Sequence, residues 1–569
     1  MLTKCIESII IFLINHTTGA VARAKANRGG TGQDETGQSR PRAAGGLLSR
    51  LLGRRPPAPA SSPRQTSDPP VVIGEIIPSA REALRQRNAA PVTVSLTTEM
   101  RSKHTYIVGK SGMGKTNYNV QLIDADIVAG RSVALIDYRG DLFDRLCTRL
   151  AARYDPDEIA DRLLLLDLRT PSADAESPPE AFTIPFNPLT QCGANPYTRA
   201  FFVLDIFEQH LGAALGVQIA ETLRNCLLAL AMTGRTLLDI DLILQSDAAR
   251  AEILSHVEDS GVLRFFSRFE ALNEAQRALW TNPIQNKISP WIASPVLKNL
   301  LGGSGSISVQ DFLDRRPDAI ILFCAGADEH FGSTAAMMVN LFVHAVAASV
   351  MRTGRPVRHN LHLYVDEFQN LSTDKFSEII SEGRRFGLWL TISHQSPSQL
   401  EPKIRTLVRN VVGTSLFFGV GGADGEVLSG EIASDEPKTL LKNLLINQKP
   451  GEAMLLRQGL AAVRIRTPHA PDPDVSAARV QALRQASLRR HGRSVAAVEA
   501  DLRAREALFP PPPRQPAANK AVDGWTGSSR VRKANKPAPH KPAPHAEDQY
   551  EVRDNDEGYD NEEVRDDDE

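Results

Sequence analysis

Cysteines are few in this sequence, and none of them lie close together. They are Cys5, Cys147, Cys192, Cys226 and Cys324. The absence of a C-x-x-C pair argues against a zinc site or a disulfide framework and fits a reducing compartment. We therefore expect the protein in the cytoplasm.

Long apolar runs are also missing. The N-terminal run covers only residues 9–14, far short of the roughly 20 residues that a membrane-spanning helix needs. We therefore predict no transmembrane segment. Residues 1–20 loosely resemble a signal peptide, but the short apolar core and Glu7 favour a short interfacial helix. Such a helix would hold the protein at the periphery of the inner membrane.

Neither sign of charge is in excess, since Lys and Arg number 66 and Asp and Glu number 67. The two signs are nevertheless separated along the chain. Residues 20–91 are basic and rich in Gly, Pro and Ala, whereas residues 547–569 are dominated by Asp and Glu. Such blocks are typical of disordered arms. The basic arm suits salt-sensitive contact with DNA phosphates or serves as a spacer; the acidic tail suits basic protein partners or simply solvates the chain end.

Strand and helix patterns alternate over most of the remaining sequence. Apolar runs typical of buried strands lie at 92–96, 105–108, 132–137, 163–168, 318–325, 361–366, 388–393 and 411–420, and a hairpin is predicted at 452–467. This alternation predicts an α/β fold with a mostly parallel sheet. Between 192 and 315 helical spacing dominates instead, which indicates an inserted all-α domain.

The predicted organisation has six parts. They are a short apolar N-terminus with a basic disordered linker (1–91), the first part of the α/β core (92–191), the helical insertion (192–315), the second part of the core (316–470), a C-terminal helical segment (471–508) and a disordered Pro-rich and acidic tail (509–569).

The stretch V-G-K-S-G-M-G-K-T-N follows an apolar run and precedes a helical pattern. It matches G-x-x-x-x-G-K-[ST], in which glycines let backbone N–H groups point at phosphates and the following helix adds its positive end. Lys115 would supply a mobile positive charge, and Thr116 a hydroxyl to Mg²⁺. The alternative is a glycine-rich surface turn. The predicted nucleotide-binding residues are Gly109, Lys110, Ser111, Gly112, Met113, Gly114, Lys115 and Thr116.

Two adjacent acids end the apolar run L-H-L-Y-V-D-E at residues 361–367. Asp366 is expected to hold Mg²⁺, and Glu367 to polarise the water that attacks the phosphate. The alternative is an acid that caps the end of a strand. Together with the glycine loop, the acid pair favours hydrolysis over phosphoryl transfer to a metabolite.

Three further residues are candidates for catalysis. Gln395 ends the next strand, T-I-S-H-Q, where it would sense the γ-phosphate or remain a solvated amide. Arg384 and Arg385 lie in E-G-R-R-F-G, on the predicted helix between those strands. Either one could reach a neighbouring subunit's γ-phosphate as an arginine finger, or both could end a solvated helix. Residues 286–289 read N-K-I-S and lack the Asp of a guanine-reading motif, so ATP is preferred.

Five stretches together resemble one family. They are G-K-S-G-M-G-K-T, V-A-L-I-D-Y-R-G-D-L (133–142), I-P-F-N-P-L (184–189), L-Y-V-D-E-F-Q-N-L (363–371) and E-G-R-R-F-G-L-W-L-T-I-S-H-Q-S-P-S-Q-L (382–400). In order and spacing they resemble the HerA–FtsK class of ring ATPases, and most of all the TraD/TraG-like coupling proteins of conjugation and type IV secretion. The resemblance covers roughly residues 92–470.

This resemblance implies a RecA-like P-loop NTPase with a helical insertion, ATP and Mg²⁺ as cofactors, a homo-hexamer with active sites at subunit interfaces, and DNA in a central pore. Relaxase or secretion-channel proteins would be partners through the tails. Lys115 and Thr116 match the phosphate loop of the family, Asp366 and Glu367 its acids, and Gln395 its sensor position.

Two features depart from the family pattern. Membrane-spanning helices are common at the start of these coupling proteins and are absent here, and the usual D-P-K-G is D-Y-R-G at 137–140, where Arg139 keeps the positive charge. Three functions stay open: a DNA-translocating motor of conjugation, a HerA-like DNA-repair translocase, and a protein-export ATPase or nucleotide-gated scaffold.

Overall fold

The structure is a computed structural model that describes residues 69–78, 90–169, 181–191, 193, 195–211, 216–327, 332–351, 359–371, 374–432, 436–469 and 471–509. It divides into two compact units. The first consists of Met1–Arg131 and Trp389–Pro471, and the second of Ser132–Leu388 and Asp472–Glu569. The predicted interfacial helix, most of the basic arm and the acidic tail lie outside the described residues.

The sheet of the first unit combines parallel and antiparallel pairs. In hydrogen-bonded order its strands are β2 (Thr93–Leu96), β1 (Val71–Ile76), β12 (Leu460–Arg466), β11 (Glu452–Arg457), β10 (Thr414–Phe418), β3 (Thr105–Val108) and β9 (Leu388–His394). β10, β3 and β9 are parallel, and β2 through β10 pair antiparallel. The parallel strands are buried almost throughout, as expected for strands covered on both faces.

Strand β1 is a correction to the predicted linker, which was placed over residues 1–91. Val71–Ile76 pairs with both β2 and β12, and its register shifts between Val72 and Gly74. A Cβ at Gly74 would lie 2.6 Å from the carbonyl oxygen of Arg466, so only glycine fits there. The basic linker therefore ends before Val71. The strand itself reads V-V-I-G-E-I and is largely apolar, but it lies within a Pro- and Arg-rich stretch whose composition favoured a linker.

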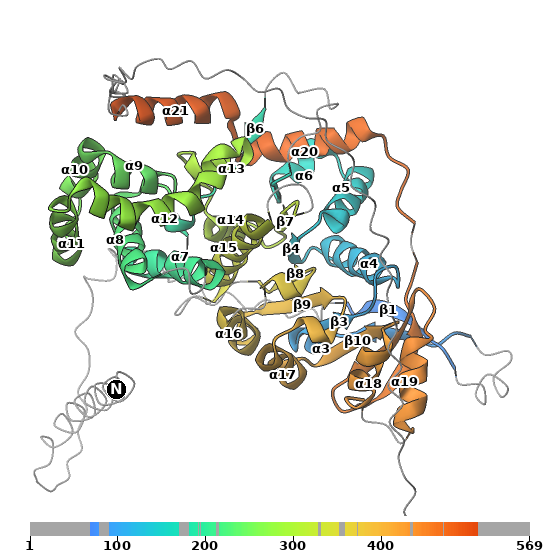
Figure 1. The fold of residues 1–569 in the computed structure, drawn as a ribbon. Helices are drawn as coiled ribbons and strands as arrows, with labels where there is room; N and C mark the ends of the chain where they lie inside the picture. The colour runs from blue at the N-terminus through green and yellow to red at the C-terminus, as the bar shows by residue number, and fades with distance from the viewer. Residues whose placement is uncertain are drawn as a thin grey trace, which may run out of the picture. The chain divides into compact units, whose positions relative to one another are not determined.

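Helices of the first unit follow its parallel strands along the chain. α4 (Lys115–Val128) follows β3 and α17 (Pro402–Val411) follows β9, and the shorter helices are α3 (Thr98–Ser102), η5 (Pro397–Gln399), α18 (Gly422–Ser429) and α19 (Lys438–Ile446). α17 starts with Pro402 in its first turn, where the missing N–H leaves no bond unmade. It buries Ile404 and Val408, which lie four residues apart on one face. α18 and α19 pack against each other (Figure 1).

A buried ion triad joins three segments of the first unit. The carboxylate of Asp126, on α4, accepts from Arg101 Nη2 at 2.6 Å and from Arg131 Nη1 at 2.9 Å. Arg131 also donates to the carbonyl of Pro69 at 2.7 Å. A buried carboxylate needs such partners because an unpaired charge is costly away from water. The triad therefore connects α3 and α4 with the segment that leads into β1.

The strands of the second unit lie in the order β8 (Leu361–Val365), β4 (Ser132–Asp137), β7 (Ile320–Cys324) and β5 (Leu163–Asp167), and each neighbouring pair is parallel. They confirm the predicted parallel α/β pattern. The elements around them are α5 (Asp141–Arg153), α6 (Pro156–Ala160), α14 (Val309–Arg315), α15 (Gly332–Val350), η3 (Phe368–Leu371), α16 (Asp374–Glu382) and η4 (Gly383–Phe386). Parallel strands present their carboxyl ends at one edge, where ligands of α/β folds bind.

A group of helices fills the chain between β5 and β7 (green in Figure 1). They are η1 (Pro188–Thr190), α7 (Pro196–Leu211), α8 (Val217–Thr233), α9 (Asp239–Gln245), α10 (Asp247–Ser255), α11 (Ser260–Glu270), α12 (Glu274–Ala293) and α13 (Pro295–Gly302). α12 opens with a capping box made by Asn273 and Gln276 and continues through Pro283 and Pro290. Within the described ranges, no helix is both long and apolar enough to cross a bilayer.

The C-terminal helices α20 (Ala477–His491) and α21 (Val495–Leu508) belong to the second unit. Between them β13 (Arg493–Ser494) pairs with β6 (Phe182–Thr183). α20 packs against the outer strand β5. There the side chain of Ser487 bonds to two backbone groups that a neighbouring strand would otherwise pair with. Its hydroxyl donates to the Leu163 carbonyl at 2.7 Å and accepts from the Leu165 N–H at 3.2 Å. Two backbone groups of this edge strand are thereby bonded to the helix, where a further strand would otherwise pair.

An arginine–aspartate cluster fastens α20 to the rest of the unit. Asp144, on α5, accepts from Arg169 Nη1 at 2.7 Å and from Arg484 Nη2 at 2.5 Å. Both guanidinium groups also lie over the ring of Phe143, at 5.5 and 5.3 Å from its centre. Arg169 further donates to Asp167 at 2.6 Å. Helices far apart in sequence are thus held by one shared carboxylate.

Acid unfolding tests this cluster. Burial alone would raise the pKa of Asp144, but Arg169 and Arg484 outweigh it and hold the pKa below its usual range. Asp144 therefore stabilises the fold fully above the unfolded pKa of about 3.9 and loses this contribution as pH falls through the lower folded pKa. We expect Asp144→Asn to lower the urea midpoint at neutral pH, and the difference from the unsubstituted protein to shrink below about pH 4. The exposed change Asp474→Asn is the control, and a pH-independent difference for Asp144→Asn would contradict the role of the ion pairs.

Candidate functional site

The loop of residues 109–116 connects β3 to α4 in the first unit and depends on glycine at two close approaches. A Cβ on Gly109 would lie 2.5 Å from the Cβ of Phe418. Gly114, the N-cap of α4, has φ 104 and would bring a Cβ to 3.1 Å from the backbone N of Gly451. A side chain is excluded by space at the first position and by backbone conformation at the second.

Neighbouring strand ends hold this loop in place. The Gly109 N–H donates to the His394 carbonyl at 3.4 Å, and the Lys110 N–H donates to the Gly419 carbonyl at 2.9 Å. The Met113 carbonyl accepts from the N–H of Gly451 at 2.9 Å. These anchors come from the ends of β9 and β10 and from the start of β11. Gln395 directly follows His394, so the structure places this predicted residue beside the loop's first anchor.

The side chain of Lys115 lies over the loop. Its Nζ donates to the carbonyl of Gly109 at 2.5 Å and to that of Lys110 at 3.1 Å. Thr116 is the second residue of α4 and is half-buried. A flexible ammonium and the positive end of a 14-residue helix are thus combined at one curled backbone segment. Such an arrangement favours an anion, and a phosphate group above all.

The predicted acid pair lies in the second unit, directly after β8. The Asp366 N–H donates to the Ile136 carbonyl on β4 at 3.0 Å. Glu367 has φ 50, in the left-handed region that residues with a side chain rarely adopt. Its carboxylate is largely buried and accepts from Gln369 Nε2 at 2.8 Å, with Arg139 Nε at 3.7 Å from its other oxygen. The backbone of Glu367 is therefore in an unfavourable conformation, and its carboxylate is oriented by the side chains of Gln369 and Arg139.

The turn after β4 carries Arg139, whose contact with Glu367 the sequence did not reveal. Asp137 is almost completely buried and accepts three backbone N–H bonds in this turn. Burial raises the pKa of Asp137, and those hydrogen bonds counter the rise only in part. The only signal in the sequence was the D-Y-R-G motif, in which Arg139 keeps the positive charge of the family's usual D-P-K-G but which does not indicate the partner of that charge.

The two candidate fingers lie on a 3₁₀ turn rather than on the predicted helix. α16 ends at Glu382, and η4 carries Arg384 and Arg385. Both are exposed. Arg385 Nη1 pairs with Glu382 at 2.8 Å and stacks over Phe386, whereas Arg384 makes no ion pair with the described residues. The two arginines, which sequence left equivalent, are therefore different in their surroundings.

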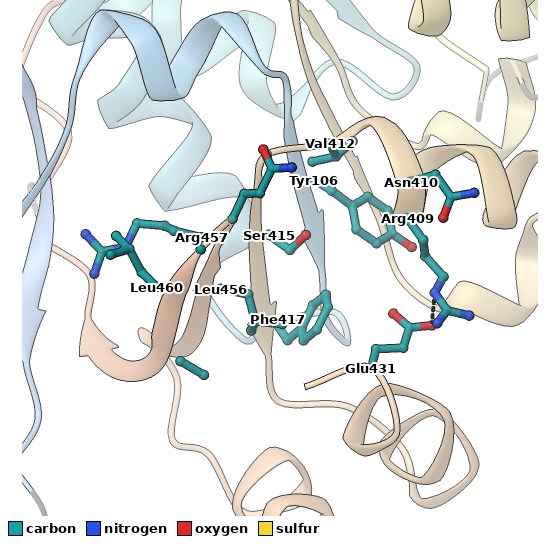
Figure 2. Close-up of a pocket in the computed structure, with 14 residues that line it drawn as sticks. Tyr106, Arg409, Asn410, Val412, Ser415, Phe417, Glu431, Leu456, Arg457 and Leu460 are labelled. Carbon is teal, nitrogen blue, oxygen red and sulfur yellow. Dashed lines mark ion pairs between the residues drawn. The ribbon is translucent and has the colours of Figure 1, made fainter. Parts of the chain in front are cut away.

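A separate hollow of about 480 Å³ lies in the first unit and was not anticipated from sequence (Figure 2). Arg409 and Glu431 form an ion pair of 3.1 Å at its side. Burial raises the pKa of Glu431, although Arg409 acts against it. Burial also raises the pKa of Tyr106, so its hydroxyl stays neutral; it lies 2.8 Å from Nε2 of His394. None of the nucleotide-binding or catalytic residues predicted from sequence line this hollow.

Metal-binding side chains do not cluster in the described part of the chain, where no group of three or more His, Cys, Asp or Glu could hold an ion. The predicted Mg²⁺ donors are a hydroxyl on Thr116 and a carboxylate on Asp366. Both are hard oxygen donors, which Mg²⁺ prefers, and Mg²⁺ commonly takes only one or two protein ligands beside water and phosphate oxygens. The donor chemistry therefore fits this ion.

Backbone strain at Glu367 can be measured by stability. A residue with a Cβ pays about 1–2 kcal/mol in the left-handed region, against about 0.5–1 kcal/mol of extra unfolded-state entropy for glycine. Because both changes remove the carboxylate, we expect Glu367→Gly to be more stable than Glu367→Ala by about 0.5–1 kcal/mol. Urea unfolding of the two variants measures the difference. Equal stability, or a more stable alanine variant, would show that the backbone is relaxed there.

Comparison with known proteins gives a likeness of fold. No family model and no curated protein matches the sequence. Solved structures do match: a bacterial conjugative coupling protein, TrwBdeltaN70, in an unbound form (14% identity, TM-score 0.49, covering 70% of this chain and 93% of that one), and the plasmid coupling protein TrwB with ADP and Mg²⁺ (15%, 0.47, 72% and 98%). VirB4 of Thermoanaerobacter pseudethanolicus also matches (16%, 0.47, 72% and 99%). Identity this low concerns the fold alone, so residue roles rest on this chain's own geometry.

Proposed function

We propose that this protein is a P-loop ATPase that binds ATP at residues 109–116 and uses its hydrolysis to move DNA. The observation that carries the proposal is the loop between β3 and α4. Gly114 is left-handed at the start of the helix, and Lys115 Nζ lies over the loop at 2.5 Å from the Gly109 carbonyl. This is the chemistry of a phosphate cradle, because N–H groups, a helix end and a mobile cation all favour the same anion.

Each predicted residue would have a separate task in hydrolysis. Mg²⁺, when bound, would neutralise charge on the phosphate oxygens, and Thr116 and Asp366 would hold it. Lys115 would bind the β- and γ-phosphates, and Gln395 would contact the γ-phosphate. Glu367 would accept a proton from the attacking water, since its carboxylate is held in one orientation by its neighbours.

The motor function rests on the order of motifs that resembles the conjugative coupling proteins of type IV secretion. On this basis the chain would form a homo-hexamer around DNA, with the ATPase core in two parts (92–191 and 316–470) and a helical insertion (192–315) between them. The basic arm and acidic tail would engage DNA and relaxase or channel proteins. The protein would work in the cytoplasm, at the periphery of the inner membrane.

Steady-state ATP hydrolysis by the full chain tests this function, with and without single- and double-stranded DNA. We expect DNA to stimulate hydrolysis. Glu367→Gln should lower the rate by about 10²–10⁴-fold, because general-base catalysis contributes on that scale. Lys115→Ala should also prevent binding of a fluorescent ATP analogue. Lys442→Ala, which removes an exposed ion pair with Glu426 in the first unit, is the control.

The outcomes separate the remaining functions. Hydrolysis that is lost in both variants but indifferent to DNA would move the assignment to a protein-export ATPase. DNA-stimulated hydrolysis that increases further with a nuclease partner would favour a HerA-like repair translocase. Nucleotide binding without hydrolysis in any form would leave a nucleotide-gated scaffold and contradict the motor.

Arg384 is the better candidate for the arginine finger. Arg385 is already paired with Glu382, whereas Arg384 is exposed and makes no ion pair with the described residues. We expect Arg384→Ala to lower DNA-stimulated hydrolysis by about 10³-fold or more, and Arg385→Ala to lower it far less. Mixing Arg384→Ala with Lys115→Ala protein should restore part of the rate if the finger acts on a neighbouring subunit. A larger loss in Arg385→Ala would reverse the assignment.

A further inference from the structure

Arg139 projects from a turn whose backbone is tightly held. The Asp137 carboxylate accepts from the N–H groups of Arg139 at 3.1 Å, Gly140 at 2.9 Å and Phe143 at 2.9 Å. Gly140 has φ 114, and a Cβ there would lie 2.7 Å from Arg169 Nη1. The turn is therefore fixed by its hydrogen bonds and by the space around it, and so is the position from which the Arg139 side chain starts.

The backbone of Glu367 is fixed relative to the same turn. The Asp366 N–H donates to the carbonyl of Ile136, which immediately precedes Asp137. On the other side, the Glu367 carbonyl accepts from the Asn370 N–H at 3.0 Å. These bonds hold Glu367 at φ 50 between two anchors. Residues at such backbone positions persist only where the surrounding structure enforces them, and they are frequent at active sites.

The Glu367 carboxylate lies between two donors that differ in kind. Gln369 Nε2 makes a hydrogen bond of 2.8 Å to Oε2, and Arg139 Nε lies 3.7 Å from Oε1. The second distance is too long for a hydrogen bond, so the guanidinium acts on Oε1 through its charge. The Arg139 side chain is 51% exposed and that of Glu367 is 11% exposed. An ion pair with so exposed a cation contributes little to folding stability.

We propose that Arg139 is a positioning residue that orients the Glu367 carboxylate for its work on the attacking water. This proposal rests on the proposed ATPase function. The hydrogen bond from Gln369 holds Oε2 and the charge of Arg139 attracts Oε1, so the two side chains together set the rotation of the carboxylate. The turn after β4 thereby acts on hydrolysis through Glu367.

Two substitutions at position 139 distinguish an effect of the arginine's charge on the Glu367 carboxylate from an effect of its packing. Arg139→Gln keeps much of the side-chain length but removes the positive charge. Arg139→Lys keeps the charge on a flexible stem and loses only the planar fork. If charge orients Glu367, the lysine variant should regain most of the rate that the glutamine variant loses.

The experiment measures kcat and KM for ATP hydrolysis by the full chain, with the Kd of a non-hydrolysable ATP analogue and the thermal midpoint. We expect Arg139→Gln to lower kcat by about 10- to 100-fold, because small misplacement of a catalytic group has effects of this size. KM and the analogue Kd should stay within about twofold, as expected when an interaction acts only in the transition state. The thermal midpoint should be unchanged, and Gln369→Ala should lower kcat in the same direction.

Two controls separate this role from a structural one. In a Glu367→Asp background the carboxylate is one methylene shorter and cannot keep the same contacts, so Arg139→Gln should there change kcat by less than about twofold. Arg268→Gln removes another exposed Arg–Glu pair of the second unit, 2.9 Å from Glu221 in the helical insertion, and should leave every measured quantity unchanged.

Several results would overturn the assignment. A kcat for Arg139→Gln equal to or above that of the unsubstituted protein would exclude a positioning role, and an equal loss in the Glu367→Asp background would show that Arg139 acts elsewhere. A loss that follows the analogue Kd or the thermal midpoint would indicate binding or folding instead. If the unsubstituted chain hydrolyses no ATP with or without DNA, the proposed ATPase function fails, and the positioning role of Arg139 fails with it. If the chain hydrolyses ATP but the rate does not depend on Arg139, only the positioning role is excluded.

Discussion

The loop of residues 109–116 packs against the ends of neighbouring strands so closely that its shape depends on theirs. Gly109 meets the Cβ of Phe418 at the end of β10, and Gly114 meets the backbone of Gly451 just before β11. Strand β10 and the residue that precedes β11 therefore support the loop as directly as its own strand β3 does. This contact explains why a hairpin about 340 residues away in sequence belongs to the same compact unit as the phosphate loop.

Shared carboxylates hold distant segments together in both units. Asp126 takes bonds from two arginines in the first unit, and Asp144 takes bonds from Arg169 and Arg484 in the second. Arginine suits this task because its planar fork can satisfy a carboxylate and a second acceptor together. Such clusters need not add net stability, but breaking one leaves an unpaired charge. They therefore specify which segments meet, including the C-terminal helix α20.

The acid pair shows how the parallel sheet of the second unit holds the backbone of two adjacent acids at the end of a strand. Its strands end at one edge, and the residues that follow them are held by hydrogen bonds between strand ends, as with Asp366 and Ile136. The cost of the left-handed backbone at Glu367 is met by these bonds. At this backbone position the Glu367 carboxylate is oriented by Gln369 and Arg139. Strain and orientation at this residue thus arise from one set of backbone contacts.

The sequence alone determined the parts of this protein whose signals are local. The apolar runs of β3, β4, β8 and β9, the glycines and lysine of residues 109–116, and the strand-end acids could all be located, because period, turn chemistry and residue type act over a few neighbours. The roles assigned to these residues stay predictions. Strand β1 reads V-V-I-G-E-I, so an apolar signal was present there, but the Pro- and Arg-rich sequence around it led to the prediction of a linker.

Only the tertiary structure decided which distant residues meet. It brought Arg139 to Glu367, Gly451 to the loop and Arg484 to Asp144, and it distinguished Arg384 from Arg385 by the pair that Arg385 makes with Glu382. It also placed the two arginines on a 3₁₀ turn where a helix was expected. Pairing between charges and close backbone approach depend on how separate segments pack, and a single sequence carries no local trace of that packing.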